Sequence, residues 1–152
     1  MQKITPFLWF NGQLEEAMTF YTSIFPNSKV GKIHRYGAGG GVVTATFELE
    51  EQQFMALNGG PQFTFSPAIS LFVDCETQEE VDELWDKLSA GGEKDQCGWL
   101  RDKFGVSWQI IPAALGEMLR DHDPARSRRV MDAMLQMQKI DIQGLKRAYE
   151  GV

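Results

Sequence analysis

The chain has 152 residues, a one-domain length, and its hydrophobic and charged fractions of 43% and 24% are ordinary for a globular protein. Its 21 acidic residues exceed its 15 basic residues, and the net charge of −6 disfavours nucleic-acid and anionic-membrane partners, because binding phosphate groups requires a basic surface. There is no apolar run of about 18 residues and no signal-peptide pattern, so we expect a cytoplasmic protein with no membrane partner.

The first 60 residues predict one strand, one helix and three further strands. Apolar residues at helical spacing indicate the helix, and runs or alternations of β-branched and aromatic residues indicate the strands. The expected helix extends over 14–25, and the expected strands over 4–10, 29–36, 42–49 and 53–57. This order is βαβββ, and the glycine-rich segment 37–41 is expected to be a hairpin loop between two strands.

The same order of elements is predicted again after a linker over 61–67. A strand over 68–73 precedes the capping box Thr77-Gln-Glu-Glu80, which opens a helix that ends at Ala90-Gly91-Gly92. Short strands are expected at 93–94, 99–101 and 106–111. The segment Glu15-Glu16-Ala17-x-x-Phe20-Tyr21 aligns with Glu79-Glu80-Val81-x-x-Leu84-Trp85, which indicates two copies of one module.

The last 40 residues predict helices. Leu115, Met118 and Leu119 form one apolar stripe, and Asp123-Pro124 is a typical helix start. The methionines of this region are expected to cover the sheet or a second copy of the chain, and the alternative is that they line an adaptable pocket. A structural or partner-binding role of this helical tail is a third, weaker hypothesis for the function of the protein.

The second module ends in a hairpin that contains one polar residue in an apolar strand. Asp102 to Gly105 carries the turn residues, and the following strand ends at Pro112. Because side chains alternate along a strand, Val106, Trp108 and Ile110 are expected to point one way. Ser107, Gln109 and Ile111 are expected to point the other way.

The run Asp102-x-x-Gly105-x-x-x-Gln109-Ile110 resembles the closing hairpin of the glyoxalase, bleomycin-resistance and extradiol-dioxygenase superfamily, also called the vicinal oxygen chelate superfamily. The chain is most similar to the PhnB-like branch, through the segments Glu15-Glu16-Ala17-Met18, Phe20-Tyr21, Ala56-Leu57-Asn58-Gly59-Gly60-Pro61, Cys97-Gly98-Trp99, Val106-Ser107-Trp108-Gln109 and 134–142.

The resemblance implies an α+β fold in which two βαβββ modules form a curved mixed sheet, or half-barrel, with a C-terminal helical extension. The expected organisation is a single domain over 1–152, with module 1 at 1–60, the linker at 61–67, module 2 at 68–112 and the helical tail at 113–152. The concave face of the sheet is then the default ligand site.

The metalloenzymes that this chain resembles hold a divalent ion with His, Glu or Gln on four strands. The matching positions are Thr5 or Pro6, Met55, Ala68 and Gln109. Of these we expect only Gln109 to offer a usable oxygen, and a stable site needs three or four donors. We therefore expect no metal at this site and no cofactor.

The remaining candidate site is a pocket with aromatic walls and a few polar groups, which suits a planar or amphipathic organic ligand. The candidate ligand-binding residues are Phe10, Phe54, Asn58, Ser70, Trp99, Trp108 and Gln109. The alternative is that the aromatic residues belong to the core and that Gln109 is satisfied locally.

No catalytic residue stands out, and His34 is a weak candidate for a general base. Strand alternation favours the alternative that His34 faces solvent. The two cysteines, Cys75 and Cys97, form no disulfide framework, and acidic neighbours are expected to raise the pKa of the Cys75 thiol. The loop over 37–41 does not lead into a helix, so it is not expected to bind a dinucleotide or a methyl donor.

Two principal hypotheses for the function follow from these observations. The first is a metal-free, homodimeric protein that binds a small organic ligand. The second is an enzyme of the same fold, with lyase-like, isomerase-like or metal-dependent chemistry at a non-standard site around His34, Asn58 and Gln109.

Overall fold

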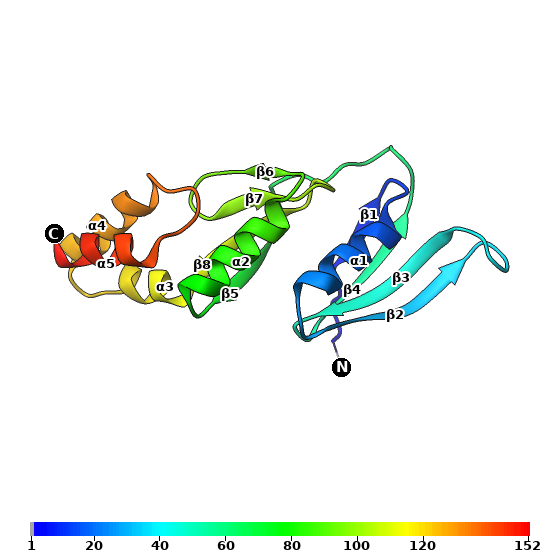
Figure 1. Ribbon diagram of the computed structural model, residues 1–152, viewed down its shortest axis with the longest axis horizontal. Helices are drawn as coiled ribbons and strands as arrows, with labels where there is room; N and C mark the ends of the chain where they lie inside the picture. Colours follow the sequence, from blue (N-terminus) through cyan, green and yellow to red (C-terminus); the bar gives the residue numbers. More distant parts are fainter. Residues whose placement is uncertain (1) are drawn as a thin grey trace. The chain divides into compact units, whose positions relative to one another are not determined.

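The computed structural model describes residues 2–152 of the chain. The chain forms two compact units, Met1–Phe65 and Ser66–Val152, here called unit 1 and unit 2. Each contains one open, curved, four-stranded mixed sheet and a helix packed on it, and unit 2 also carries the C-terminal helices (Figure 1). The predicted α+β fold with two βαβββ modules and a helical extension is therefore confirmed. The division falls inside the predicted linker, and the single domain over 1–152 stays a prediction.

Unit 1 contains β1 (Phe7–Phe10), α1 (Leu14–Ile24), β2 (Ser28–Arg35), β3 (Val42–Leu49) and β4 (Gln52–Asn58). The strand order is β1-β4-β3-β2, with β1 parallel to β4 and the other pairs antiparallel. The first strand is shorter than expected and begins at Phe7.

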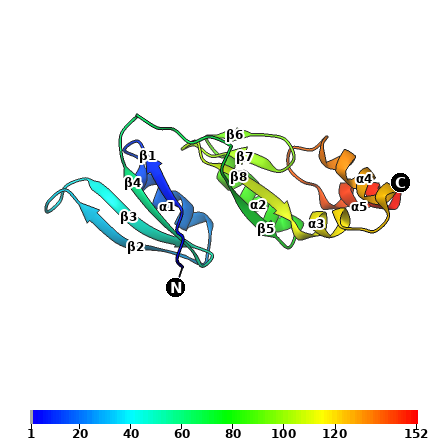
Figure 2. The same ribbon diagram turned by 180° about the vertical axis from the view of Figure 1, so that it is seen from behind.

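The core of unit 1 lies between α1 and one face of its sheet. Tyr21 of α1 is fully buried and stacks on Phe47 at 6.2 Å between ring centroids, and Phe47 stacks on Phe54 at 5.1 Å. The strands lie in front of α1 when the molecule is seen from behind (Figure 2). One face of this sheet is thus covered by α1, and the opposite face is not covered by any helix of unit 1.

Strand β2 contains a β-bulge. Val30 pairs with Phe47 and Ile33 pairs with Ala45, so three steps along β2 correspond to two steps along β3. The Thr46 hydroxyl Oγ1 accepts a hydrogen bond of 2.9 Å from the Lys32 N–H at this point. A Cβ on Gly31 would lie 2.3 Å from the same oxygen, so a larger residue at that position would displace the Thr46 hydroxyl.

Unit 2 repeats the arrangement with β5 (Ser70–Cys75), α2 (Gln78–Ser89), β6 (Glu93–Lys94), β7 (Trp99–Arg101) and β8 (Ser107–Pro112). The strand order is β5-β8-β7-β6, with β5 parallel to β8. The Thr77 half of the predicted capping box is present, because the Thr77 side chain accepts from the Glu80 N–H. The Glu80 carboxylate accepts from the N–H of Glu76, one residue before the N-cap.

The C-terminal helices are α3 (Ala113–Leu119), α4 (Pro124–Met134) and α5 (Ile142–Glu150). They enclose a second hydrophobic core within unit 2, made by Ile111, Leu115, Val130, Ile140 and Leu145, with three methionines packed against it. Gln78 of α2 fastens this tail, since its Nε2 donates to the Ile140 carbonyl at 3.0 Å and its Oε1 accepts from the Ile142 N–H at 2.8 Å. The tail is therefore an integral part of unit 2.

Candidate functional site

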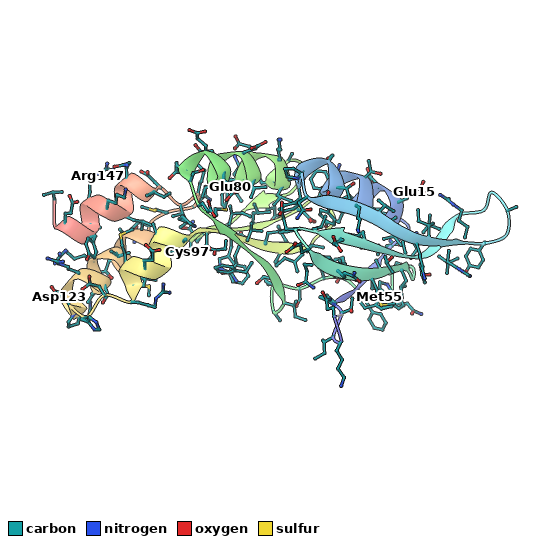
Figure 3. The ribbon with its side chains drawn as sticks, turned by 90° about the horizontal axis from the view of Figure 1, so that it is seen from below. Glu15, Met55, Glu80, Cys97, Asp123 and Arg147 are labelled. Carbon is teal, nitrogen blue, oxygen red and sulfur yellow. The ribbon has the colours of Figure 1, made fainter. Side chains whose placement is uncertain are left out.

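Each sheet has one face on its helix. The opposite face is free of helices in unit 1, and in unit 2 the C-terminal helices pack against it at Ile111, near the end of β8. In unit 1, Glu15 on α1 and Met55 on β4 lie on opposite sides of the sheet (Figure 3). Strand alternation places Phe7 and Thr46 on the same side as Met55, and the three residues are paired across β1, β4 and β3. These uncovered faces are the surfaces on which a ligand can contact side chains of several strands at once.

The uncovered face of unit 2 carries a row of three paired residues. Gln109 of β8 pairs with Phe72 of β5 on one side and with Trp99 of β7 on the other, so an amide lies between two aromatic rings. Gln109 Nε2 donates to the Ser70 hydroxyl at 2.9 Å, and Gln109 Oε1 accepts no hydrogen bond from residues 2–152. Phe72 is 59% exposed, while Ser70, Trp99 and Gln109 are half-buried. This row presents one hydrogen-bond acceptor flanked by two apolar surfaces.

Three of the aromatic residues expected in the pocket lie in the cores instead. Phe10 and Phe54 are 2% and 4% exposed beneath α1, where Phe10 contacts Phe65 edge to face at 5.3 Å. Trp108 is 2% exposed on the α2 side of its sheet. The roles of these three residues as ligand contacts stay predictions, and their burial favours the alternative that they belong to the core, where large apolar side chains gain most free energy.

The Trp108 indole is held by a buried carboxylate. Its Nε1 donates to Asp102 Oδ2 at 2.9 Å, and Asp102 Oδ1 accepts from the N–H groups of Phe104 and Val106 at 2.9 and 3.0 Å. Asp102 therefore closes the turn and also fixes the ring that fills the core. The turn residues identified in the sequence serve the fold of the hairpin.

Asn58 also has a structural role. Its Oδ1 accepts from the Leu14 N–H at 3.0 Å, and its Nδ2 donates to the Val42 carbonyl at 3.0 Å. The residue before α1, Gln13, makes no side-chain cap, so Asn58 satisfies a helix N–H that would otherwise lack a partner. The expected role of Asn58 in ligand binding stays a prediction, and it is not favoured because both ends of the amide are used within the fold.

His34 lies in a groove of about 300 Å³ on the uncovered face of unit 1. The residues that line this groove are Phe7, Lys32, Ile33, His34, Thr44, Ala45, Thr46, Met55 and Ala56. His34 pairs with Thr44 across β2 and β3, and among residues 2–152 no carboxylate forms an ion pair or hydrogen bond with its ring. The side chain is exposed, as alternation predicted.

The side chains at the implied metal positions do not suit a metal ion. Met55 offers a thioether in the groove of unit 1 and Gln109 an amide on the face of unit 2. Within residues 2–152, no three His, Cys, Asp or Glu side chains are grouped so that they could hold an ion. This donor set lacks the three or four O, N or S ligands of a stable site.

The Cys75 thiol is not an activated nucleophile. Burial, followed by the charges of Glu80 and Asp74, raises the pKa of Cys75 to about 12. The expected direction is confirmed, with Glu80 contributing in place of the sequence neighbour Glu76. Both cysteines are free thiols, and Cys75 stays protonated at neutral pH.

The structure adds Phe7, Lys32 and Phe72 to the candidate residues. Phe72 has the same strand parity as Ser70, so alternation alone would have placed it beside Gln109. The position of Lys32 in the groove can be predicted only if the bulge is recognised. The sequence signal of the bulge is the three-residue spacing of the apolar residues Val30 and Ile33, because a regular strand cannot place both on one face.

A family model described as 3-demethylubiquinone-9 3-methyltransferase matches residues 2–111. The match spans both βαβββ modules and leaves the helical tail outside it. No protein among the curated sequences matches this chain significantly.

Solved structures with the same fold include a PhnB protein of Bacillus cereus, whose name also carries the words 3-demethylubiquinone-9 3-methyltransferase. It is 46% identical to this chain, with a TM-score of 0.69, and the match covers 74% of this chain and all of that one. A Pseudomonas aeruginosa protein matches with a TM-score of 0.64 at 20% identity, covering 74% and 98% of the two chains. The fosfomycin resistance protein of Listeria monocytogenes matches with a TM-score of 0.59 at 17% identity, covering 79% and 98%.

Proposed function

This chain belongs to the PhnB-like family of the vicinal oxygen chelate superfamily, and from that premise we propose that it binds a small organic molecule without a metal ion. The ligand is planar, carries a hydrogen-bond donor and lies on the uncovered face of unit 2. The absence of a suitable donor set at the implied metal positions supports the metal-free part of this proposal.

The row formed by Phe72, Gln109 and Trp99 is the observation that carries the proposal. Two rings on either side of an amide give a planar ligand apolar surface to stack on, and each such contact contributes about 0.5–1.5 kcal/mol. Gln109 Nε2 is already bonded to Ser70, which orients the amide and leaves Oε1 to accept from the ligand. The row thus combines stacking with one fixed polar contact, as ligand sites commonly do.

Methyl transfer is not supported by the geometry of this chain, although the description of the family model names it. A methyl-donor or dinucleotide loop follows a strand and opens a helix. The glycine-rich segment 37–41 instead connects β2 to β3, two antiparallel neighbours in one sheet. In the described part of the chain, the first helix after this segment is α2, and β3, β4, the linker and β5 lie between them.

The enzymatic alternative has less support. In nucleophile–base arrangements a third group commonly orients the base. In residues 2–152 no side-chain hydrogen bond or ion pair holds the exposed His34 ring. Asn58, which the alternative also requires, is used to begin α1. The arrangement around His34 is therefore better suited to binding than to proton transfer.

Binding of 2-naphthol and of 2-methoxynaphthalene, measured by isothermal titration calorimetry, tests the proposal. The two molecules share a planar ring system, but only 2-naphthol can donate to Gln109 Oε1. We expect 2-naphthol to bind more tightly, and Gln109→Leu to remove that difference. Trp99→Ala and Phe72→Ala should each lower the affinity for both molecules by about fivefold, since a stacking contact of about 1 kcal/mol is lost.

Tyr36→Ala is the control, because Tyr36 is an exposed aromatic residue, 75% accessible, in the β2–β3 loop of unit 1 and outside the row. It should leave both affinities unchanged, and treatment of the protein with EDTA should do the same. The proposal fails if Tyr36→Ala weakens binding as much as Trp99→Ala, or if neither naphthalene binds.

The proposal includes a homodimer in the cytoplasm. Large apolar side chains remain exposed in both units, among them Ile69 at 80% and Phe63 at 62%, and a second copy would remove such surface from water. Both cysteines are free, which is consistent with a reducing compartment. In the part of the chain that the structure describes, no helix is long and apolar enough to cross a bilayer.

A further inference from the structure

The groove of unit 1 differs in chemistry from the face of unit 2, because it carries positive charge. Phe7 and Met55 form its apolar side, and the hydroxyl residues Thr44 and Thr46 line it from β3. Lys32 and His34 line it from β2. Its volume of about 300 Å³ lies at the lower end of the range for small-molecule pockets.

The bulge in β2 brings Lys32 to this groove. Thr46 lies opposite the bulge, and its Oγ1 accepts from the Lys32 N–H at 2.9 Å, so the backbone of Lys32 is fixed to the uncovered face. Gly31 permits this close approach, because a Cβ there would lie 2.3 Å from Thr46 Oγ1. Bulges often redirect one side chain next to a functional site, and here the redirected residue carries an ammonium group.

The groove is basic although the whole chain has a net charge of −6. Two of the lining residues are Lys or His, and none is Asp or Glu. In residues 2–152, Lys32 forms no ion pair, whereas the neighbouring basic residue Arg35 pairs with Glu15 at 3.5 Å. The nearest acidic residue along β3, Glu48, is paired in the sheet with Lys29, outside the groove.

We propose that this groove binds an organic anion, a carboxylate carried on an aromatic or similarly apolar body. The carboxylate oxygens would accept hydrogen bonds from Lys32 Nζ and the His34 ring, and the apolar body would lie on Phe7 and Met55. The site is confined to unit 1 and shares no residue with the row on unit 2. The proposal therefore goes beyond the function proposed above and can hold or fail independently of it.

Benzoate is the probe, and the chain offers an unusually simple readout because it contains two histidines. In a two-dimensional NMR spectrum of the histidine rings, benzoate should shift the His34 resonances and leave those of His122, which lies between α3 and α4, unchanged. Benzamide has the same ring without the charge, and acetate has the charge without the ring. Both should bind at least about fivefold more weakly than benzoate, because each lacks one of the two contacts.

Lys32→Met should weaken benzoate binding by about fivefold or more, and Lys32→Arg should restore most of it. Lys29→Met is the matched control, since it makes the same charge change on the same strand outside the groove. Equal losses for Lys32→Met and Lys29→Met would overturn the proposal, as would equal affinity for benzoate and benzamide or for benzoate and acetate. Unchanged His34 resonances at about 10 mM benzoate would overturn it as well.

Discussion

The Asp102 carboxylate shows how one side chain determines the geometry of the closing hairpin. It is 3% exposed and accepts hydrogen bonds from two backbone N–H groups of its own turn and from the indole of Trp108. An amide in its place offers only one acceptor oxygen, so it cannot accept all three bonds in either orientation. Because three hydrogen-bond donors meet at this side chain, it has to be a carboxylate.

Asp102→Asn is expected to lower the free energy of unfolding by about 2 kcal/mol, because at least one buried donor loses its acceptor. Urea unfolding followed by tryptophan fluorescence measures this loss. In thermal unfolding, the corresponding fall in Tm is about 4–8 °C for a chain of this size. Asp86→Asn makes the same charge change at an exposed position on α2 and should have little effect, because the Asp86 side chain makes no hydrogen bond with residues 2–152. A loss of stability in Asp86→Asn as large as that in Asp102→Asn would refute the explanation.

The turn between β3 and β4 has a backbone conformation that its two central residue types disfavour. Glu50 and Glu51 have φ values of 48° and 69°, and the flanking residues Leu49 and Gln52 pair directly. Positive φ at both central residues is the pattern of a type I′ turn, for which Asn-Gly is preferred. Two glutamates in this conformation store backbone strain that the rest of the sheet must offset.

The double substitution Glu50→Asn/Glu51→Gly is expected to raise the free energy of unfolding by about 1 kcal/mol, because it relieves this strain. Calorimetry should show a rise in Tm of about 2–4 °C. The control Glu50→Gln/Glu51→Gln removes the same two charges but keeps both Cβ atoms. If the control gains as much stability as the Asn-Gly variant, charge repulsion and not backbone strain is the cause.

Most elements could be predicted from periodicity, and the exceptions have physical reasons. The strands over 42–49 and 99–101 have the predicted bounds, and α1 ends one residue before the predicted end. The strand over 29–36 was predicted as a regular alternation, but a bulge at Gly31 and Lys32 interrupts it. Such a bulge depends on the hydrogen bond to Thr46, a contact between strands that local pattern does not contain.

The candidate site was predicted only in part, because residue type was weighted above strand parity. Alternation already put Trp108 and Gln109 on opposite faces of β8, yet both were expected in one pocket. The structure agrees with the alternation, since Trp108 lies in the core and Gln109 on the uncovered face. The role of Asn58 had no local signal, because its partner Leu14 lies 44 residues earlier in the chain.

For the molecule as a whole, the strand order leaves sheet edges that nothing in the same unit pairs with. β1 and β5 are edge strands of their sheets, and Ile69 beside β5 is 80% exposed. Unpaired edges next to exposed apolar residues favour association with another sheet. In the proposed homodimer, a second copy of the chain provides the other sheet.

Light scattering during size-exclusion chromatography is expected to give about twice the chain mass of 17.2 kDa at micromolar concentration. Ile69→Asp should shift the population toward a single chain, because a charge placed in a buried contact costs several kcal/mol. Val152→Asp is the matched control, since Val152 is 83% exposed at the C-terminus and should tolerate the same charge. A wild-type protein that elutes as a single chain at micromolar concentration would exclude the homodimer, and an Ile69→Asp variant that remains dimeric would show that β5 does not form the interface.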